Sequence, residues 1–163
     1  MRIKWFSLIR ITGLLLVLLY HFFQTIFPGG FFGVDVFFTF SGFLITTLLI
    51  EEFSKNHEIN LIGFFRRRFY RIVPPVVLMV LVTMPFTFLV RQDYVAGIGG
   101  QIAGVLGFMT NFYELLTGGS YESQFIPHLF VHNWSLAVEV HYYILWGLAV
   151  WFLSKRSKSS SQL

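Results

Sequence analysis

Four apolar runs, each long enough to cross a bilayer, constrain this chain more than any other feature. They lie at residues 5–27, 31–50, 72–90 and 134–153, and a helix needs roughly 20 apolar residues to cross the hydrocarbon core. The chain is 55% hydrophobic and only 12% charged, a balance that ordinary soluble domains do not show. The sequence therefore predicts an all-α, polytopic transmembrane helix bundle.

The connections between these runs complete the predicted topology. Only Pro-Gly-Gly separates the first two runs, which predicts a tight helical hairpin. A weaker, glycine-rich run at 98–116 could be a fifth span, a re-entrant segment or a surface helix. We expect one membrane domain over residues 1–153, followed by a basic, serine-rich and disordered tail at 154–163.

The basic residues predict the orientation in the membrane. With four spans and a cytoplasmic N-terminus, every Lys and Arg except Arg91 lies on the cytoplasmic side. A fifth span would move the tail and Arg91 outside together, so the positive-inside rule favours four spans. This placement explains the basic composition without nucleic acid. The chain has no cysteine and its five histidines are scattered, so we predict neither thiol chemistry nor a metal site.

Arg10 and His21 lie within the first apolar run, where an ionisable side chain is costly. Eleven residues separate them, which on a helix is a rise of about 16 Å and a return to nearly the same face. We therefore predict that one helix face links a cation near the inner boundary to an imidazole near the outer one. The alternatives are a headgroup anchor for Arg10 and a packing contact for His21.

Asp35 follows the predicted hairpin turn closely. Its carboxylate is expected beside the His21 imidazole, where it would orient the ring. Ser41 and Gly42 lie further along the same run and could instead mark close helix packing.

The segment FFRRRFYRIVPP, residues 64–75, is predicted to be a cytoplasmic loop. Its four arginines and interleaved aromatic rings could bind a phosphate-bearing ligand, with an adenine stacked on a ring. Ordinary positive-inside anchoring explains the same composition. Pro74 and Pro75 suit the opening turn of the following helix.

A last polar block, HNWSLAVEVHYYILW, opens the fourth run at residues 132–146. Asn133 is a candidate N-cap of a helix. Polar residues then recur at helical spacings of three and four: Ser135, Glu139 and Tyr142 or Tyr143. The aromatic residues could equally form an interfacial belt, but a carboxylate inside a span is rarely there for packing.

These blocks, in this order, resemble the acyltransferase-3 family, membrane O-acyltransferases that modify bacterial surface glycans. Arg10 and His21 fit its Arg, ten residues, His signature, and GVDVFFTFSGFLIT fits its second-span block. Arg68 and Arg71 fit its Arg-x-x-Arg motif, and HNWSLAVEVHYY resembles its His-x-Trp-Ser-Leu-x-Val-Glu-Glu-x-Phe-Tyr block. The chain has Val140 and His141 where the family usually has polar residues. The resemblance covers residues 8–153.

The resemblance implies a multi-pass enzyme of the bacterial plasma membrane. It would move an acyl group, usually acetyl, from cytoplasmic acyl-CoA to a hydroxyl of an extracytoplasmic polysaccharide or peptidoglycan. We predict His21 as general base, oriented by Asp35 or Glu139. The predicted donor contacts are Arg10, Arg68 and Arg71. The predicted acceptor contacts are His132, Trp134, Ser135 and Ser41.

Other functions stay open on the sequence. The family's domain usually has more spans, so an inactive truncated fragment is an alternative. A non-catalytic membrane subunit, completed by a second polypeptide, is another. Covalent catalysis by Ser41 or Ser135 ranks below direct transfer because neither serine lies in a strand-to-helix elbow, and an acyl-histidine intermediate remains open. A transporter would also place ionisable groups inside the membrane, but the sequence has no inverted repeat.

Overall fold

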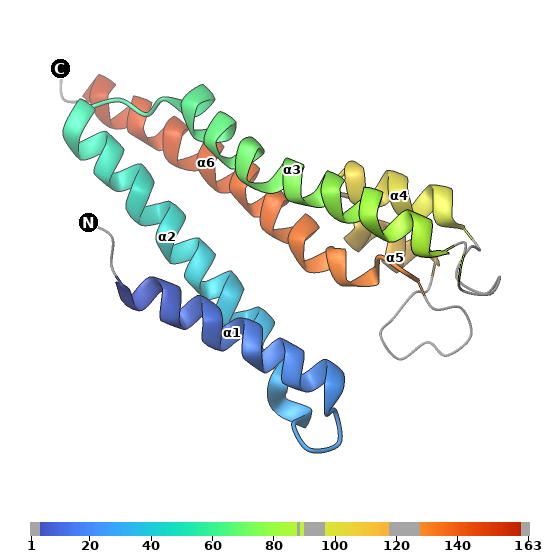
Figure 1. Cartoon of the computed structure of the whole chain (residues 1–163). Coiled ribbons are helices and arrows are strands. Elements are labelled where there is room, and N and C mark those ends of the chain that lie inside the picture. Colours follow the sequence, from blue (N-terminus) through green and yellow to red (C-terminus); the bar gives the residue numbers. More distant parts are fainter. Residues whose placement is uncertain (1–3, 88, 90–96, 118–127, 161–163) are drawn as a thin grey trace. The chain divides into compact units, whose positions relative to one another are not determined.

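The computed structural model describes residues 4–87, 89, 97–117 and 128–160, without the side chains of 4–7, 10 and 157–160. Every regular element that these residues form is a helix, which confirms the predicted all-α fold (Figure 1). The elements are α1 (Lys4–Phe22), η1 (Pro28–Phe31), α2 (Phe32–Asn56), α3 (Leu61–Thr87), α4 (Ile98–Leu106), α5 (Thr110–Thr117), η3 (Val131–Asn133) and α6 (Trp134–Ser160).

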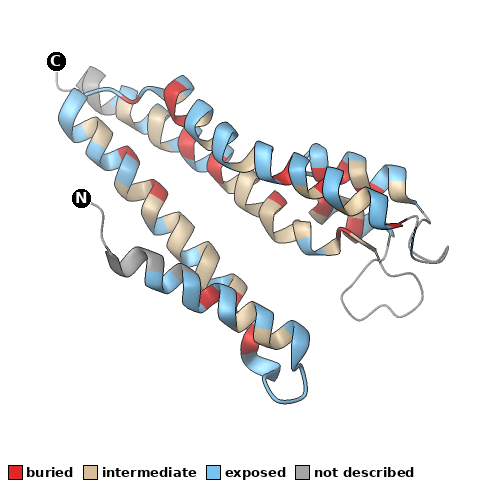
Figure 2. Ribbon diagram, in the orientation of Figure 1, coloured by how far each residue is buried: buried red, intermediate tan, exposed pale blue. Residues whose placement is uncertain are grey.

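Within the described residues, three helical stretches have the length and apolar composition of a membrane span. They are Pro28–Asn56, Leu61–Thr87 and Val131–Arg156, and the apolar stretch Ile11–Phe22 is shorter. Large apolar side chains stay exposed along these helices, as lipid-facing residues do (Figure 2). The chain is thus built as a membrane protein, and the count of four spans stays a prediction.

The chain forms two compact units, Met1–His57 and Glu58–Leu163. The first is the predicted hairpin, in which α1 packs against η1 and α2. Its two helices approach closely because glycines face each other. A Cβ added to Gly33 would lie 2.5 Å from the Gly13 carbonyl oxygen, and one added to Gly30 would lie 2.5 Å from that of Leu16. Small residues at a helix crossing permit this approach.

We expect Gly33→Ala to destabilise the hairpin. The new methyl group would collide with the Gly13 backbone, which cannot move aside as a flexible side chain could. Overpacking of this kind costs about 1–3 kcal/mol. The measurement is the melting temperature of the full chain in detergent micelles. Gly99→Ala is the matched control, because a Cβ there meets nothing within 4 Å. Equal shifts for the two variants would contradict the prediction.

The predicted cytoplasmic loop at 64–75 is wrong, because these residues belong to helix α3. The helix begins early since the Asn60 side-chain oxygen accepts a hydrogen bond from the Gly63 N–H at 2.8 Å, as an N-cap does. Its arginines therefore have fixed positions on a helix surface.

Pro74 and Pro75 lie inside α3, and their predicted place in its opening turn is also wrong. A proline in a helix interior costs about 3 kcal/mol in water. Membrane helices tolerate it better, because neighbouring groups can satisfy the carbonyls that lose their partners.

The second unit is built on α3 and α6, which lie side by side with α4 and α5 near the end of α3 (Figure 1). Its apolar core contains Val76 and Val80 of α3, Val105 of α4, and Phe130 before η3. The 98–116 run is two short helices, and the chain turns between them at Phe108, where φ is 54°. One continuous fifth span over this run is therefore excluded.

The predicted disordered tail is wrong for residues 154–160, because α6 continues to Ser160. Two basic side chains near this end lie over aromatic rings one turn earlier. Lys155 Nζ is 4.2 Å from the centroid of Trp151, and Arg156 Cζ is 5.4 Å from that of Phe152. These cation–π contacts favour the helical conformation.

Candidate functional site

His21 lies in the last turn of α1 and its side chain is exposed. Its Nδ1 atom is 2.8 Å from the Val17 carbonyl oxygen. A carbonyl can only accept, so Nδ1 carries the hydrogen in this contact and Nε2 is the basic nitrogen of the neutral ring. The Tyr20 ring stands edge-on to the imidazole at 5.6 Å. The backbone carbonyl of Val17 thus favours this tautomer.

Asp35 lies in the first turn of α2, and its side chain is exposed. It stands at the end of the hairpin where α1 finishes, so the first unit brings Asp35 and His21 to the same end (Figure 1). A carboxylate in a first turn complements the positive end of the helix dipole. Ser41 is half-buried on α2, six residues further along. Contact between Asp35 and His21 stays a prediction.

The second unit brings Arg68, Tyr143 and Glu139 together. The Arg68 guanidinium carbon lies 5.6 Å from the Phe64 ring centroid on α3 and 5.5 Å from the Tyr143 centroid on α6. The Tyr143 hydroxyl donates a hydrogen bond to the Glu139 carboxylate one turn earlier. Glu139 and Tyr143, two of the polar residues that recur at helical spacing in the sequence, thus contact each other on α6.

Arg66, Arg67 and Arg71 are exposed on α3, whereas Arg68 is half-buried between the two rings. Arg71 lies one turn from Arg68 on an adjoining part of the helix surface. Arg10 lies in α1, and its side chain is outside the part that the structure describes. Continuous helix from Lys4 to Phe22 nonetheless keeps positions 10 and 21 on one face.

The block at 132–135 forms the junction between η3 and α6. His132 is exposed, while Trp134 and Ser135 are half-buried. The Ser135 hydroxyl donates to the His132 carbonyl oxygen at 3.3 Å, and the Asn133 amide donates back to the Phe130 carbonyl at 3.4 Å. Asn133 precedes the helix as predicted, and its capping role stays a prediction.

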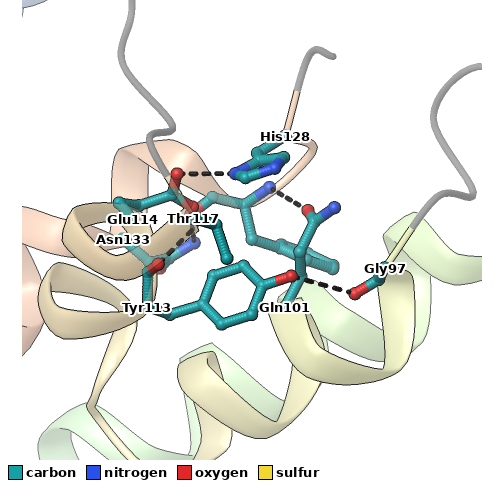
Figure 3. Close-up of polar contacts among 8 residues, drawn as sticks. Gly97, Gln101, Tyr113, Glu114, Thr117, His128 and Asn133 are labelled. Carbon is teal, nitrogen blue, oxygen red and sulfur yellow. Dashed lines mark hydrogen bonds and ion pairs between the residues drawn. The ribbon is translucent and has the colours of Figure 1, made fainter.

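Polar contacts, partly buried, join α4 and α5 to each other and to the segment before η3 (Figure 3). Glu114 of α5 and His128 are hydrogen-bonded, with His128 Nδ1 2.6 Å from a Glu114 carboxyl oxygen. The Glu114 side chain is 8% exposed and that of His128 is 10% exposed. The Gln101 side-chain oxygen accepts from the Phe130 N–H at 3.4 Å. The Tyr113 hydroxyl donates to the Gly97 carbonyl oxygen at 3.3 Å. These contacts fix the chain just ahead of His132.

Within the described residues, the first unit offers the basic imidazole nitrogen of His21 and the carboxylate of Asp35 on α2. The second unit offers the Arg68 guanidinium beside aromatic rings and the carboxylate of Glu139 on α6. These groups suit proton transfer and the binding of an anionic ligand. Within the described ranges, no three His, Cys, Asp or Glu side chains are placed to hold a metal ion.

Residues 3–162 match the sequence model of the family Acyl_transf_3, whose description is "Acyltransferase domain". The chain belongs to this acyltransferase family. The resemblance that the four sequence blocks predicted is confirmed, and the acyltransferase-3 match extends it to almost the whole chain.

Two curated relatives of this acyltransferase-3 chain are O-acetyltransferases. It is 32% identical to O-acetyltransferase OatA of Staphylococcus aureus over 150 residues, which is 92% of this chain and 25% of that protein. It is 31% identical to peptidoglycan O-acetyltransferase OatA of Listeria monocytogenes over 139 residues, which is 85% of this chain and 22% of that protein. The chain thus spans about a quarter of the length of these relatives. No solved structure matches it.

Two features of the acyltransferase-3 chain have no signal in the local sequence. Nothing in the local sequence connects His128 to Glu114, fourteen residues earlier. The contact of Arg68 with Tyr143 joins α3 to α6, so only the tertiary fold reveals it. By contrast, Glu139 and Tyr143 are four residues apart, a spacing that the sequence displays.

Proposed function

We propose that this chain takes part in membrane O-acyl transfer, moving an acetyl group from acetyl-CoA to a hydroxyl of a cell-surface glycan. The observation that carries the proposal is the acyltransferase match over residues 3–162. The printed name of the Listeria relative, a peptidoglycan O-acetyltransferase, supports peptidoglycan as the acceptor class.

Arg68, Arg71 and Arg10 are the proposed donor contacts. Coenzyme A carries phosphates, and guanidinium groups bind phosphate oxygens through paired, charge-assisted hydrogen bonds. The Arg68 guanidinium carbon lies 5.6 Å from the Phe64 ring centroid and 5.5 Å from that of Tyr143, contacts that support a fixed position for this cation. The positive-inside rule supports a cytoplasmic N-terminus in a bacterial plasma membrane, with the acceptor on the opposite side.

His21 is the proposed general base. The His21 Nε2 atom takes the proton of the acceptor hydroxyl while the hydroxyl oxygen attacks the acyl carbonyl carbon. The carbon–sulfur bond of the thioester then breaks, and the coenzyme A sulfur leaves and takes up a proton. The hydrogen bond to the Val17 carbonyl supports this role, because it holds the hydrogen on Nδ1. Direct transfer of this kind needs no acyl-enzyme.

Asp35 and Glu139 are the proposed catalytic carboxylates. Asp35 stands at the His21 end of the hairpin, which supports a role in stabilising the imidazolium formed during transfer. His132, Trp134, Ser135 and Ser41 are the proposed acceptor contacts. Hydroxyl, imidazole and indole groups of this kind bind sugars through hydrogen bonds and ring contacts.

Deleting the gene in the organism that carries it tests the proposal. We expect base-labile acetyl esters to disappear from wall or capsule glycans, measured by mass spectrometry of the digested polymer, and to return on complementation. Unchanged acetylation in the deletion strain would overturn the proposal. A non-catalytic subunit that acts with a second polypeptide is the alternative if deletion removes the esters but substitution of His21 does not.

A further inference from the structure

Tyr143 contacts both an arginine and a carboxylate of the proposed site with different parts of its side chain. The residue is 6% exposed on α6. Its ring lies under the Arg68 guanidinium at 5.5 Å, and its hydroxyl donates to Glu139. A buried tyrosine normally finds a partner for its hydroxyl, and here that partner is a carboxylate inside a span.

The fold secures this arrangement from two helices. Phe64, four residues before Arg68 on α3, supplies the second ring under the guanidinium at 5.6 Å. Gly147, four residues after Tyr143 on α6, lets the two helices approach, since a Cβ there would lie 3.1 Å from a Phe64 ring carbon. Arg68 is therefore confined between rings of α3 and α6, which restricts the rotamers of an otherwise flexible side chain.

We propose that Tyr143 is a positioning residue that couples donor binding to transfer. Its ring fixes the guanidinium that holds a donor phosphate, and its hydroxyl fixes the Glu139 carboxylate. Because one side chain performs both tasks, the two effects can be separated by substitution. The inference rests on the proposed function, since it gives Tyr143 a role in that same reaction.

Tyr143→Phe keeps the ring under Arg68 and removes only the hydroxyl, whereas Tyr143→Leu removes both. Tyr142→Phe is the matched control, because that neighbouring ring instead stacks on Trp146 at 6.0 Å. The assay follows labelled acetyl groups from acetyl-CoA to wall glycan in permeabilised membranes of the source organism. Rates are normalised to the amount of tagged protein, and kcat and the KM for acetyl-CoA are measured separately.

For Tyr143→Phe we expect kcat to fall about tenfold or more, the effect of losing a hydrogen bond to a charged group, with KM within about twofold. For Tyr143→Leu we expect the same fall in kcat and a KM raised about tenfold, because Arg68 loses its platform. Tyr142→Phe should match the wild type.

Two results would overturn the inference while leaving the proposed function intact. One is a Tyr143→Phe enzyme whose kcat equals that of the wild type. The other is a Tyr143→Leu enzyme whose KM equals that of Tyr143→Phe. If the Tyr143 variants only lower the amount of protein, and kcat and the KM for acetyl-CoA stay unchanged, Tyr143 has a purely structural role and the inference is also overturned. If the wild type transfers no acetyl group, the proposed function fails, and the inference fails with it.

Discussion

Acetylation of the surface glycan is expected to fall at least about 100-fold when His21 is replaced by asparagine. A positioned general base contributes roughly 10²–10⁴-fold to such a reaction, and asparagine cannot accept the proton of the acceptor hydroxyl. The side chain is exposed at the end of α1, so its replacement should leave the amount of protein in the membrane unchanged. Mass spectrometry of acetyl esters and an immunoblot of the tagged chain measure the two quantities.

His57→Asn is the control for this substitution. His57 is also an exposed histidine of the first unit, and its φ of 53° is one that asparagine tolerates. The control should retain wild-type acetylation. If His21→Asn acetylates glycan as well as His57→Asn does, His21 has no part in proton transfer.

The second large effect is expected on stability, at the buried Glu114–His128 pair. His128→Leu would leave the Glu114 carboxylate in a site that is 8% exposed and without its 2.6 Å partner. Leaving a buried hydrogen-bonding group without its partner typically costs about 1–3 kcal/mol, and more when the group is charged. The free energy of unfolding of the full chain, measured by denaturant titration in detergent micelles, should fall by that order.

The double variant Glu114→Leu/His128→Leu tests whether the cost comes from leaving the buried Glu114 carboxyl group without its partner. Replacing both members of a buried pair with apolar groups is often close to neutral. The double variant should therefore recover most of the stability that His128→Leu loses. If the two variants are equally unstable, the loss reflects packing around His128 rather than an unpaired carboxyl group.

The hairpin and the spanning helices could be predicted because their signals are local. The Pro-Gly-Gly turn lies between two apolar runs, and the structure places η1 there between α1 and α2. The spacing of Glu139 and Tyr143 is likewise one helical turn. Periodicity and turn residues carry such information within a few positions of the chain.

The arginine segment shows why other parts could not be predicted. Its four arginines and two prolines led to the prediction of a loop. In the structure, the Asn60 side chain caps α3 ahead of Arg66, so the segment is helical. The role of His128 depends on α5 folding back near it, and that depends on the turn at Phe108. The partner of Arg68 lies 75 positions further along the chain, on α6. Contacts at such separations arise from packing and have no counterpart in local sequence.

The adjacent prolines of α3 have a mechanical consequence. Pro74 and Pro75 have no N–H groups, so the carbonyls of Tyr70 and Arg71 receive no hydrogen bond from the next helical turn. Sharp bends in helices usually occur at proline, and α3 has a pair of prolines here and a single one, Pro85, near its end. The pair therefore marks a compliant point between the arginine-bearing half of the helix and its apolar half. A change of helix angle there would tilt the half of α3 that carries the arginines, while the half with Val76 and Val80 keeps its contacts in the apolar core.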